Sequence, residues 1–238
     1  MGNLYNFGIM FLKILRLVFR FIFRIIARID SADMAKIPPS GACLAVSNHL
    51  GHLDAILAMV LSDREDVIMM VAEKYQKYWI WRWVARNLDA LWLDRHTTDF
   101  RTLREVQKRL NAGGIAAVAP EGTRSATGQM QPGKPGAAYL AAKTGALILP
   151  MALTGTWDKE VYRRLKRFQR LDITIRVGEP FTVPPLPRHN KDEFLQKHTD
   201  EMMCRVAALL PPEFRGVYAE HPRLQELLAE QLQKETGD

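Results

Sequence analysis

The sequence predicts an α/β fold, with a mixed, largely parallel central sheet that is flanked by helices and preceded by an amphipathic amino-terminal helix or helix pair. Short apolar runs, typical of buried strands, alternate along the chain with longer segments of helical periodicity. The 238 residues, 47% hydrophobic and 25% charged, suffice for a substantial core without disulfide or metal staples. Two cysteines, Cys43 and Cys204, are too few for a disulfide scaffold or a four-cysteine zinc ribbon.

Residues 4–29 predict a helix, or two helices, lying in a membrane interface. Basic residues recur every three or four positions within roughly 120° of the helical circumference, and the rest is apolar. They are Lys13, Arg16, Arg20, Arg24 and Arg28. Charges this frequent argue against a transmembrane span or a signal peptide. We expect residues 1–36 to anchor the protein, with the basic stripe facing anionic head groups. The alternative is a core helix with snorkelling arginines.

The remaining elements follow from apolar runs and helical periodicity. A break at residues 37–41, Ile-Pro-Pro-Ser-Gly, opens the main domain, which we place at residues 37–215. We predict strands at 42–47, 67–71, 91–93, 115–119, 146–152 and 171–177, and helices at 55–61, 98–110, 136–144 and 193–210. The alternation of apolar and polar side chains in 171–177 indicates an edge or antiparallel strand. Residues 216–238 are expected to form a helical tail.

The charge balance favours anionic partners. The formal net charge is +7, and the basic stripe against Asp30 accounts for +4 of it. Such a balance suits nucleic acid, anionic lipid or a phosphorylated substrate. The basic run at 163–167, Arg-Arg-Leu-Lys-Arg, is not accompanied by a nucleic-acid motif, so we expect a solvated or lipid-facing loop and no nucleic-acid partner. We expect the tryptophans at 79, 81 and 83 to lie partly in the protein core and partly in an aromatic belt at the membrane interface.

A first candidate motif follows the predicted strand at 42–47. His49 and Asp54 are five residues apart, which places them about 140° apart on a continuous helix. Their side chains can meet only if the chain bends between them, and Gly51 permits a bend. A histidine that is hydrogen-bonded to a carboxylate is a positioned general base. The alternative is a loop histidine with an aspartate that caps a helix.

Further polar blocks follow other predicted strands. Residues 119–125 read Ala-Pro-Glu-Gly-Thr-Arg-Ser, in which Thr123 and Arg124 are of phosphate-binding type. Lys134 stands beside the amino terminus of a predicted helix, where anions bind favourably. Arg95 follows the strand at 91–93, and Pro150 closes another. The alternative for the block at 119–125 is a polar loop with a structural glycine.

In this order and spacing, the blocks resemble the glycerolipid acyltransferase family, and more closely its 1-acyl-sn-glycerol-3-phosphate acyltransferases. The resemblance covers about residues 38–185. It implies that His49 is the catalytic base and Asp54 its orienting carboxylate. It implies an acceptor pocket and phosphate site formed by Arg95, Glu121, Gly122, Thr123, Arg124 and Lys134. Gly51 and Ala119 depart from the usual serine and phenylalanine of the family.

The resemblance also implies the reaction. A fatty acyl group moves from a thioester, acyl-CoA or acyl-carrier protein, to the free sn-2 hydroxyl of 1-acyl-sn-glycerol-3-phosphate, giving phosphatidic acid without a cofactor or metal. Backbone N–H groups near Gly51 or Gly122 would stabilise the oxyanion. The expected location is the cytoplasmic face of the cytoplasmic or inner membrane, as a peripheral, monotopic enzyme of phospholipid synthesis.

Three alternatives stay open at this point. The acceptor can be another lysophospholipid or a lyso-aminolipid. A metal-dependent hydrolase would use His49, His52 and Asp54 as ligands. A non-catalytic membrane-binding protein would use the amino-terminal segment alone.

Overall fold

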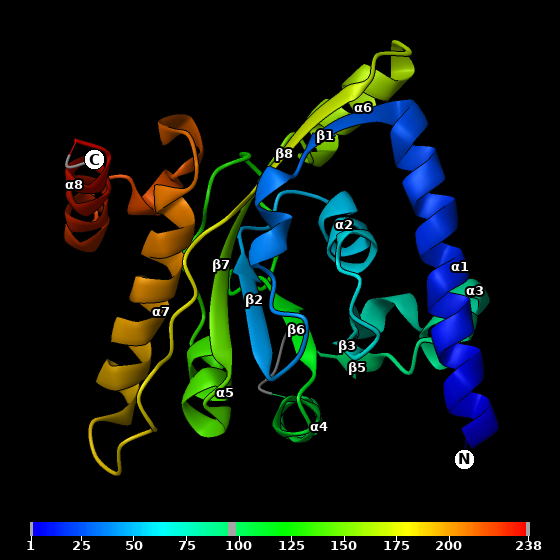
Figure 1. The fold of residues 1–238 in the computed structure, drawn as a ribbon, viewed down its shortest axis with the longest axis horizontal. Helices are drawn as coiled ribbons and strands as arrows, with labels where there is room; N and C mark the ends of the chain where they lie inside the picture. Colours follow the sequence, from blue (N-terminus) through cyan, green and yellow to red (C-terminus); the bar gives the residue numbers. More distant parts are fainter. Residues whose placement is uncertain (1, 95–98, 237–238) are drawn as a thin grey trace.

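A six-stranded sheet forms the centre of the computed structural model, which describes residues 2–94 and 99–236 (Figure 1). The strand order is β1-β8-β7-β2-β6-β3. The strands are β1 (Ala27–Asp30), β2 (Cys43–Ser47), β3 (Val67–Ile68), β6 (Ile115–Val118), β7 (Leu147–Thr154) and β8 (Leu171–Val177). Neighbouring strands are parallel except β7 and β8, which are antiparallel. The predicted mixed, largely parallel sheet is therefore confirmed.

Helices cover both faces of this sheet. One face packs against α4 (Phe100–Asn111), α5 (Gly136–Thr144), α7 (Lys191–Ala208) and α8 (Pro222–Thr236). The other face packs against α1 (Gly2–Ile26) and α2 (Leu53–Leu61). Burial on both faces explains why β2 reads as a continuous apolar run, Cys-Leu-Ala-Val, rather than an alternating one. The remaining helices are α3 (Trp79–Asn87), α6 (Asp158–Lys166) and the short 3-10 turns η1 (Ala32–Lys36), η2 (Glu73–Tyr75), η3 (Pro212–Phe214) and η4 (Gly216–Tyr218).

Two predicted strands differ from the structure in their pairing. The segment 67–71 is divided, because β3 pairs with β6 whereas β4 (Met70–Ala72) pairs with β5 (Leu91–Leu93) in a separate two-stranded sheet. The strand at 171–177 is antiparallel to β7, as expected, but it is not an edge strand. Its other side is paired with β1, which the sequence analysis assigned to the amino-terminal helix. Pairing with a strand from far along the chain overrides the helical periodicity there.

Two residues of the basic stripe of α1, Arg16 and Arg20, reach into the protein, so the prediction that the whole stripe faces head groups is wrong for them, whereas Lys13, Arg24 and Arg28 are exposed. The Arg16 side chain is buried and donates to the carbonyls of Met59, at 2.9 Å, and Arg64, at 2.5 Å. Arg20 donates to the Val60 carbonyl at 3.0 Å and to Asp63 at 2.7 Å. The last carbonyls of a helix lack partners within it and carry partial negative charge. These two arginines therefore satisfy the carboxyl end of α2 and its following turn.

Part of the apolar surface of α1 points away from the protein, whereas Leu12 and Phe23 are buried against it. Its exposed side chains are Met10, Ile14, Leu17, Val18, Phe21, Ile22 and Ile25. The segment forms one helix rather than two. Within the described ranges, the structure contains no helix that is both long and apolar enough to cross a bilayer.

The carboxy-terminal segment packs onto the main core. Tyr218, Leu224 and Leu227 are buried among residues of α5, α7 and β2. The Tyr218 hydroxyl accepts a hydrogen bond from the backbone N–H of Gly133 at 2.9 Å, just before Lys134. The tail thus helps to fix a loop of the candidate site. The predicted boundaries of the main domain, after residues 36 and 215, stay a prediction.

Candidate active site

The candidate residues gather where β2 and β6 end. The loop 48–52 follows β2, and the loop 119–135 follows β6, its direct parallel neighbour. Carboxyl ends of adjacent parallel strands open at the same edge of a sheet. The Ser125 backbone N–H donates to the His49 carbonyl at 2.8 Å, so the two loops are joined. Topology therefore brings together blocks that are some 70 residues apart in sequence.

His49 and Asp54 form a close pair. His49 Nδ1 lies 2.7 Å from Asp54 Oδ2, and both side chains are largely buried. The same oxygen accepts the backbone N–H groups of Leu50 and Gly51, at 2.7 and 2.9 Å. Asp54 therefore holds the bend before α2 as well as the imidazole. Because Nδ1 faces the carboxylate, Nε2 is the nitrogen left to exchange a proton with a substrate.

Gly51 is required by a close approach rather than by its backbone angles. A Cβ at this position would lie 2.1 Å from the Thr156 carbonyl oxygen and 2.7 Å from Asp158 Oδ1. The connection from β7 to α6 therefore lies directly against the histidine loop. This contact explains why this chain carries glycine where the resemblance suggests serine.

Glu121 lies behind His49, where its carboxyl group organises two loops. It is 3% exposed. Its Oε1 accepts the His49 backbone N–H at 3.0 Å, and its Oε2 accepts the backbone N–H and side-chain amide of Gln131, at 3.2 and 3.3 Å. Burial raises the pKa of the Glu121 carboxyl to about 7, although these hydrogen bonds act in the opposite direction. Its implied place in an acceptor pocket stays a prediction.

Arg124 is held by an aspartate that the sequence analysis missed. Arg124 Nη1 lies 2.5 Å from Asp158 Oδ2 and 2.7 Å from His52 Nδ1. Asp158 Oδ1 accepts the backbone N–H of His52 at 2.9 Å. Asp158 stands at the start of α6, in a segment without a recognised motif, so only the spatial approach to Gly51 reveals it. The structure thus ties the arginine to the histidine loop through one carboxylate.

A polar cleft lies beside the glycine of the second loop. It has a volume of about 250 Å³ and is lined by Ala72, Glu73, Lys74, Leu93, Asp94, Gly122, Thr123 and Lys134. Gly122 has a φ of +70°, and the Lys134 side chain lies 3.2 Å from the position of a Cβ there. The cleft contains two ammonium groups, of Lys74 and Lys134, beside the carboxylates of Glu73 and Asp94. Lys74 was not among the predicted site residues, because its position after β4 belongs to no motif. Arg95 lies outside the described residues.

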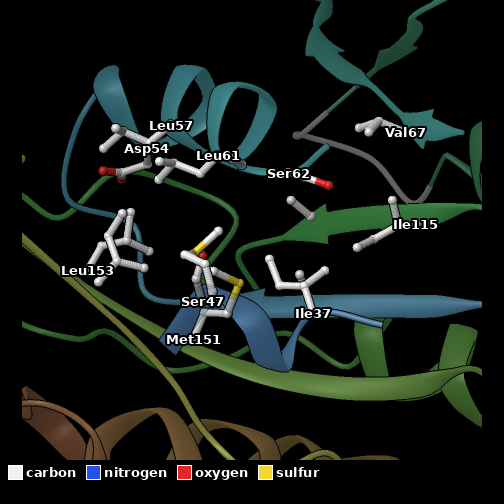
Figure 2. Close-up of a pocket in the computed structure, with 15 residues that line it drawn as sticks. Ile37, Ser47, Asp54, Leu57, Leu61, Ser62, Val67, Ile115, Met151 and Leu153 are labelled. Atoms are coloured by element: carbon white, nitrogen blue, oxygen red, sulfur yellow. The ribbon is translucent and has the colours of Figure 1, made fainter. Parts of the chain in front are cut away.

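An apolar cavity, lined at one end by Asp54, lies between α2 and the sheet (Figure 2). Its volume is about 50 Å³, and its lining is almost entirely aliphatic, from Asp54 through Leu57 and Leu61 to Val67 and Ile115. Asp54 lines this cavity, and its buried Oδ1 has no hydrogen-bond partner among the described residues. Asp54 therefore borders a narrow apolar space, while His49 is joined to the polar loop 119–135.

The two expected oxyanion donors are already engaged. The Gly51 N–H donates to Asp54, and the Gly122 N–H donates to the Ala119 carbonyl at 3.0 Å. A metal set of His49, His52 and Asp54 does not assemble, because His52 turns toward Asp158. In the ranges 2–94 and 99–236, no three histidine, cysteine or acidic side chains converge on one point.

Comparison with known proteins indicates an acyltransferase, the class that the motifs of the candidate site resemble. The sequence model of the Acyltransferase family matches residues 28–154. The 1-acyl-sn-glycerol-3-phosphate acyltransferase alpha of Homo sapiens is 29% identical over 188 residues, which cover 74% of this chain and 61% of that protein. A probable 1-acyl-sn-glycerol-3-phosphate acyltransferase of Mycoplasma pneumoniae is 27% identical, over 75% of this chain and 70% of that one. A chloroplastic relative from Brassica napus is matched over only 37% of its length, at 28% identity.

A solved structure shares the fold. The 1-acyl-sn-glycerophosphate acyltransferase PlsC of Thermotoga maritima superimposes with a TM-score of 0.61 at 25% identity, covering 80% of this chain and 75% of that one. Because the family match spans more than half of the sequence and includes His49, Asp54 and Arg124, the chain belongs to the Acyltransferase family. Within this family it is a glycerolipid acyltransferase that resembles the 1-acyl-sn-glycerol-3-phosphate acyltransferases.

Proposed function

We propose that this protein transfers an acyl group from a thioester to the sn-2 hydroxyl of 1-acyl-sn-glycerol-3-phosphate, giving phosphatidic acid. The observation that carries the proposal is the position of the His49–Asp54 pair. Asp54 lines an apolar cavity, and the loop that is hydrogen-bonded to His49 lines a polar cleft that contains Lys74 and Lys134. A lysophosphatidic acid and an acyl thioester each combine an aliphatic chain with an anionic end, so this junction suits both. The names of the relatives add independent support.

The chemistry needs one base and no covalent intermediate. His49 Nε2 accepts the proton of the sn-2 hydroxyl while its oxygen bonds to the thioester carbonyl carbon. Asp54 stabilises the imidazolium that forms, through the 2.7 Å contact with Nδ1. The tetrahedral intermediate then expels the thiolate, which takes the proton from His49. The C–O bond replaces the C–S bond, and the base returns to its starting state.

The anionic end of the acceptor is assigned to the polar loops. Arg124 and Lys134 supply charge there, and Asp158 fixes Arg124 beside His52. Guanidinium and ammonium groups form strong, charge-assisted hydrogen bonds with phosphate oxygens. Arg95 completes this proposed set as the resemblance implies.

The protein is proposed to act from a membrane surface, on the cytoplasmic face. The apolar face of α1 is exposed, and α3 beside it exposes Trp79, Trp81 and Trp83, which are thus not core residues. The rings of Phe11 and Trp83 meet edge to face at 5.0 Å, which joins the two helices. An apolar helix face with a tryptophan belt is typical of interfacial binding. The head groups would then meet Arg82 and Arg86 of α3, which are exposed beside the tryptophans.

Product analysis tests the acceptor. Full-length protein in detergent micelles is supplied with acyl-CoA and either 1-acyl-sn-glycerol-3-phosphate, 1-acyl-sn-glycerol-3-phosphocholine or no acceptor. We expect phosphatidic acid to form in equal amount to the thiol released, and only with the first acceptor. Equal or faster product formation from the choline lipid would contradict the proposed acceptor while keeping acyl transfer. The same assay with acyl-carrier protein decides the donor.

A further inference from the structure

The turn between α6 and β8 exposes an aromatic side chain completely. Phe168 is 99% exposed, so its ring gains almost nothing from packing within the protein. Tyr162 and Leu165, on the last two turns of α6, are 63% and 40% exposed. Burial of such side chains is normally a main source of folding free energy. Tyr162, Leu165 and Phe168 therefore form an exposed apolar cluster at the end of α6, the tip.

The backbone at Phe168 is unfavourable for this residue type as well. Its φ is +54°, in the left-handed region. The Phe168 N–H donates to the Leu165 carbonyl at 3.1 Å, and the Gln169 N–H donates to the Arg164 carbonyl at 3.0 Å. These bonds form the helix-ending motif in which glycine is preferred at the left-handed position. Phenylalanine is thus retained at a position where it costs stability twice, through its conformation and through its exposure.

Basic side chains surround this tip. The segment 163–170 contains Arg163, Arg164, Lys166, Arg167 and Arg170. Arg163 and Arg164 are paired with Glu160. Within the described residues, Lys166 and Arg167 form no ion pair, and the Lys166 ammonium lies 4.4 Å from the centre of the Tyr162 ring. An exposed aromatic tip with unneutralised cations is complementary to an anionic lipid surface.

The tip is attached to the carboxyl end of α1. Arg170 Nη2 donates to the Arg24 carbonyl at 2.8 Å and also to the Ala27 carbonyl. Figure 1 places the α6–β8 turn just beyond the end of α1, while α3 lies near its opposite end. Phe21 and Ile25, near this end of α1, are 66% and 59% exposed. The tip therefore extends the apolar surface that α1 presents.

We propose that Tyr162, Leu165 and Phe168 form a second membrane contact, in which Phe168 inserts among acyl chains and Lys166 and Arg167 bind anionic head groups. The proposal rests on the proposed membrane association of α1 and adds an attachment point from the catalytic domain. With contacts at both ends of α1, the protein would be fixed in orientation on the bilayer rather than free to pivot about one helix.

Depth-dependent quenching tests the insertion directly. Full-length Phe168→Cys carries an environment-sensitive thiol-reactive fluorophore; Cys43 and Cys204 are buried and react poorly. Vesicles contain phosphatidylglycerol, phosphatidylcholine and lipids with a quencher on the acyl chain. The control is Val217→Cys, an equally apolar site that is 60% exposed on η4. We expect quenching and a blue-shifted emission at residue 168 only. Equal, weak quenching at both positions, with the protein bound to the vesicles, would overturn the tip contact.

Phe168→Gly separates membrane binding from folding. Glycine relieves the left-handed conformation, so we expect the melting temperature in solution to rise by roughly 2–4 °C. Vesicle affinity should fall about tenfold, since burial of one phenylalanine ring is lost. A parallel Lys166→Glu, Arg167→Glu variant should weaken binding to anionic vesicles only. Unchanged affinity of Phe168→Gly would contradict the proposal, as would capture of a protein partner by the tip without vesicle binding.

These outcomes are distinguishable from failure of the proposed function. Wild-type protein that does not cosediment with vesicles would overturn both membrane contacts. Wild type that binds, with an unquenched residue 168, would overturn the tip alone. Phosphatidic acid synthesis in detergent micelles does not need the tip, so that activity should be equal in wild type and Phe168→Gly.

Discussion

At the scale of single residues, carboxylates organise the candidate site. Asp54 holds the His49 imidazole and two backbone N–H groups with one oxygen, Glu121 holds the His49 backbone, and Asp158 holds Arg124 and the next histidine. The histidine loop is therefore fixed from three directions. Such preorganisation reduces the cost of placing a base against a substrate hydroxyl.

Arg124→Ala tests the phosphate assignment. Loss of a charge-assisted hydrogen bond costs about 1.5–3 kcal/mol, so we expect kcat/KM for 1-acyl-sn-glycerol-3-phosphate to fall roughly 10- to 150-fold. The KM of the acyl donor should change little. The matched measurement uses 1-monoacylglycerol, which lacks the phosphate and should show no comparable loss. An unchanged kcat/KM for the phosphate acceptor would remove Arg124 from the proposed site.

Glu121→Gln should change how stability depends on pH. In the folded protein the pKa of Glu121 is about 7, whereas the unfolded chain releases this proton near the ordinary value of about 4.3. The native state therefore binds the proton more tightly, and stability falls as pH rises between these values, by up to about 3 kcal/mol. Chemical unfolding of both proteins at pH 4.5, 6 and 7.5 should show this contribution in wild type only. Parallel pH profiles would refute it.

At the scale of elements, α1 shows what a periodicity can and cannot predict. The helix and its two faces follow from the spacing of basic residues, but the direction of each face does not. The carbonyls that Arg16 reaches belong to Met59 and Arg64, more than forty positions away, so only the tertiary structure reveals them. The same limit applies to β1, which exists because β8 pairs with it.

Arg16→Met tests this inward orientation. Methionine preserves much of the side-chain volume but leaves two buried carbonyls without a donor, at a cost of about 1–3 kcal/mol each. We expect a clearly lower melting temperature in detergent. Arg24→Met is the control, because Arg24 lies on the same helix with its side chain exposed and should change stability by less than about 0.5 kcal/mol. Equal effects of the two variants would contradict the assigned role of Arg16.

The candidate site was predictable to the extent that its residues stand in local blocks. His49, Asp54, Glu121 and Arg124 follow strand ends, where parallel sheets gather functional side chains, and the structure brings these four together. Asp158 and Lys74 stand outside any block, and their proximity depends on how α6 and the small β4–β5 sheet pack. Gly51 differs from the family pattern because of that packing rather than because of the reaction.

At the scale of the whole molecule, the positions of the candidate catalytic pair and of the exposed apolar surfaces suit an enzyme that acts at a membrane. The sheet presents the His49–Asp54 pair at its strand ends, and α1, α3 and the α6–β8 turn present apolar surface. The proposed substrates reside in a bilayer or carry an aliphatic chain, so an enzyme seated on the surface meets them directly. In the proposed reaction, acyl transfer depends on His49 acting as the base.

Acceptor-dependent thiol release from acyl-CoA tests that claim most directly. Wild type, His49→Ala and the control His189→Ala, an exposed histidine on a remote loop, are compared with and without 1-acyl-sn-glycerol-3-phosphate. Loss of a general base costs about 10²–10⁴-fold in rate. We expect this loss for His49→Ala, with an unchanged melting temperature, and full activity of His189→Ala. Acceptor-dependent release at the wild-type rate by His49→Ala would contradict it.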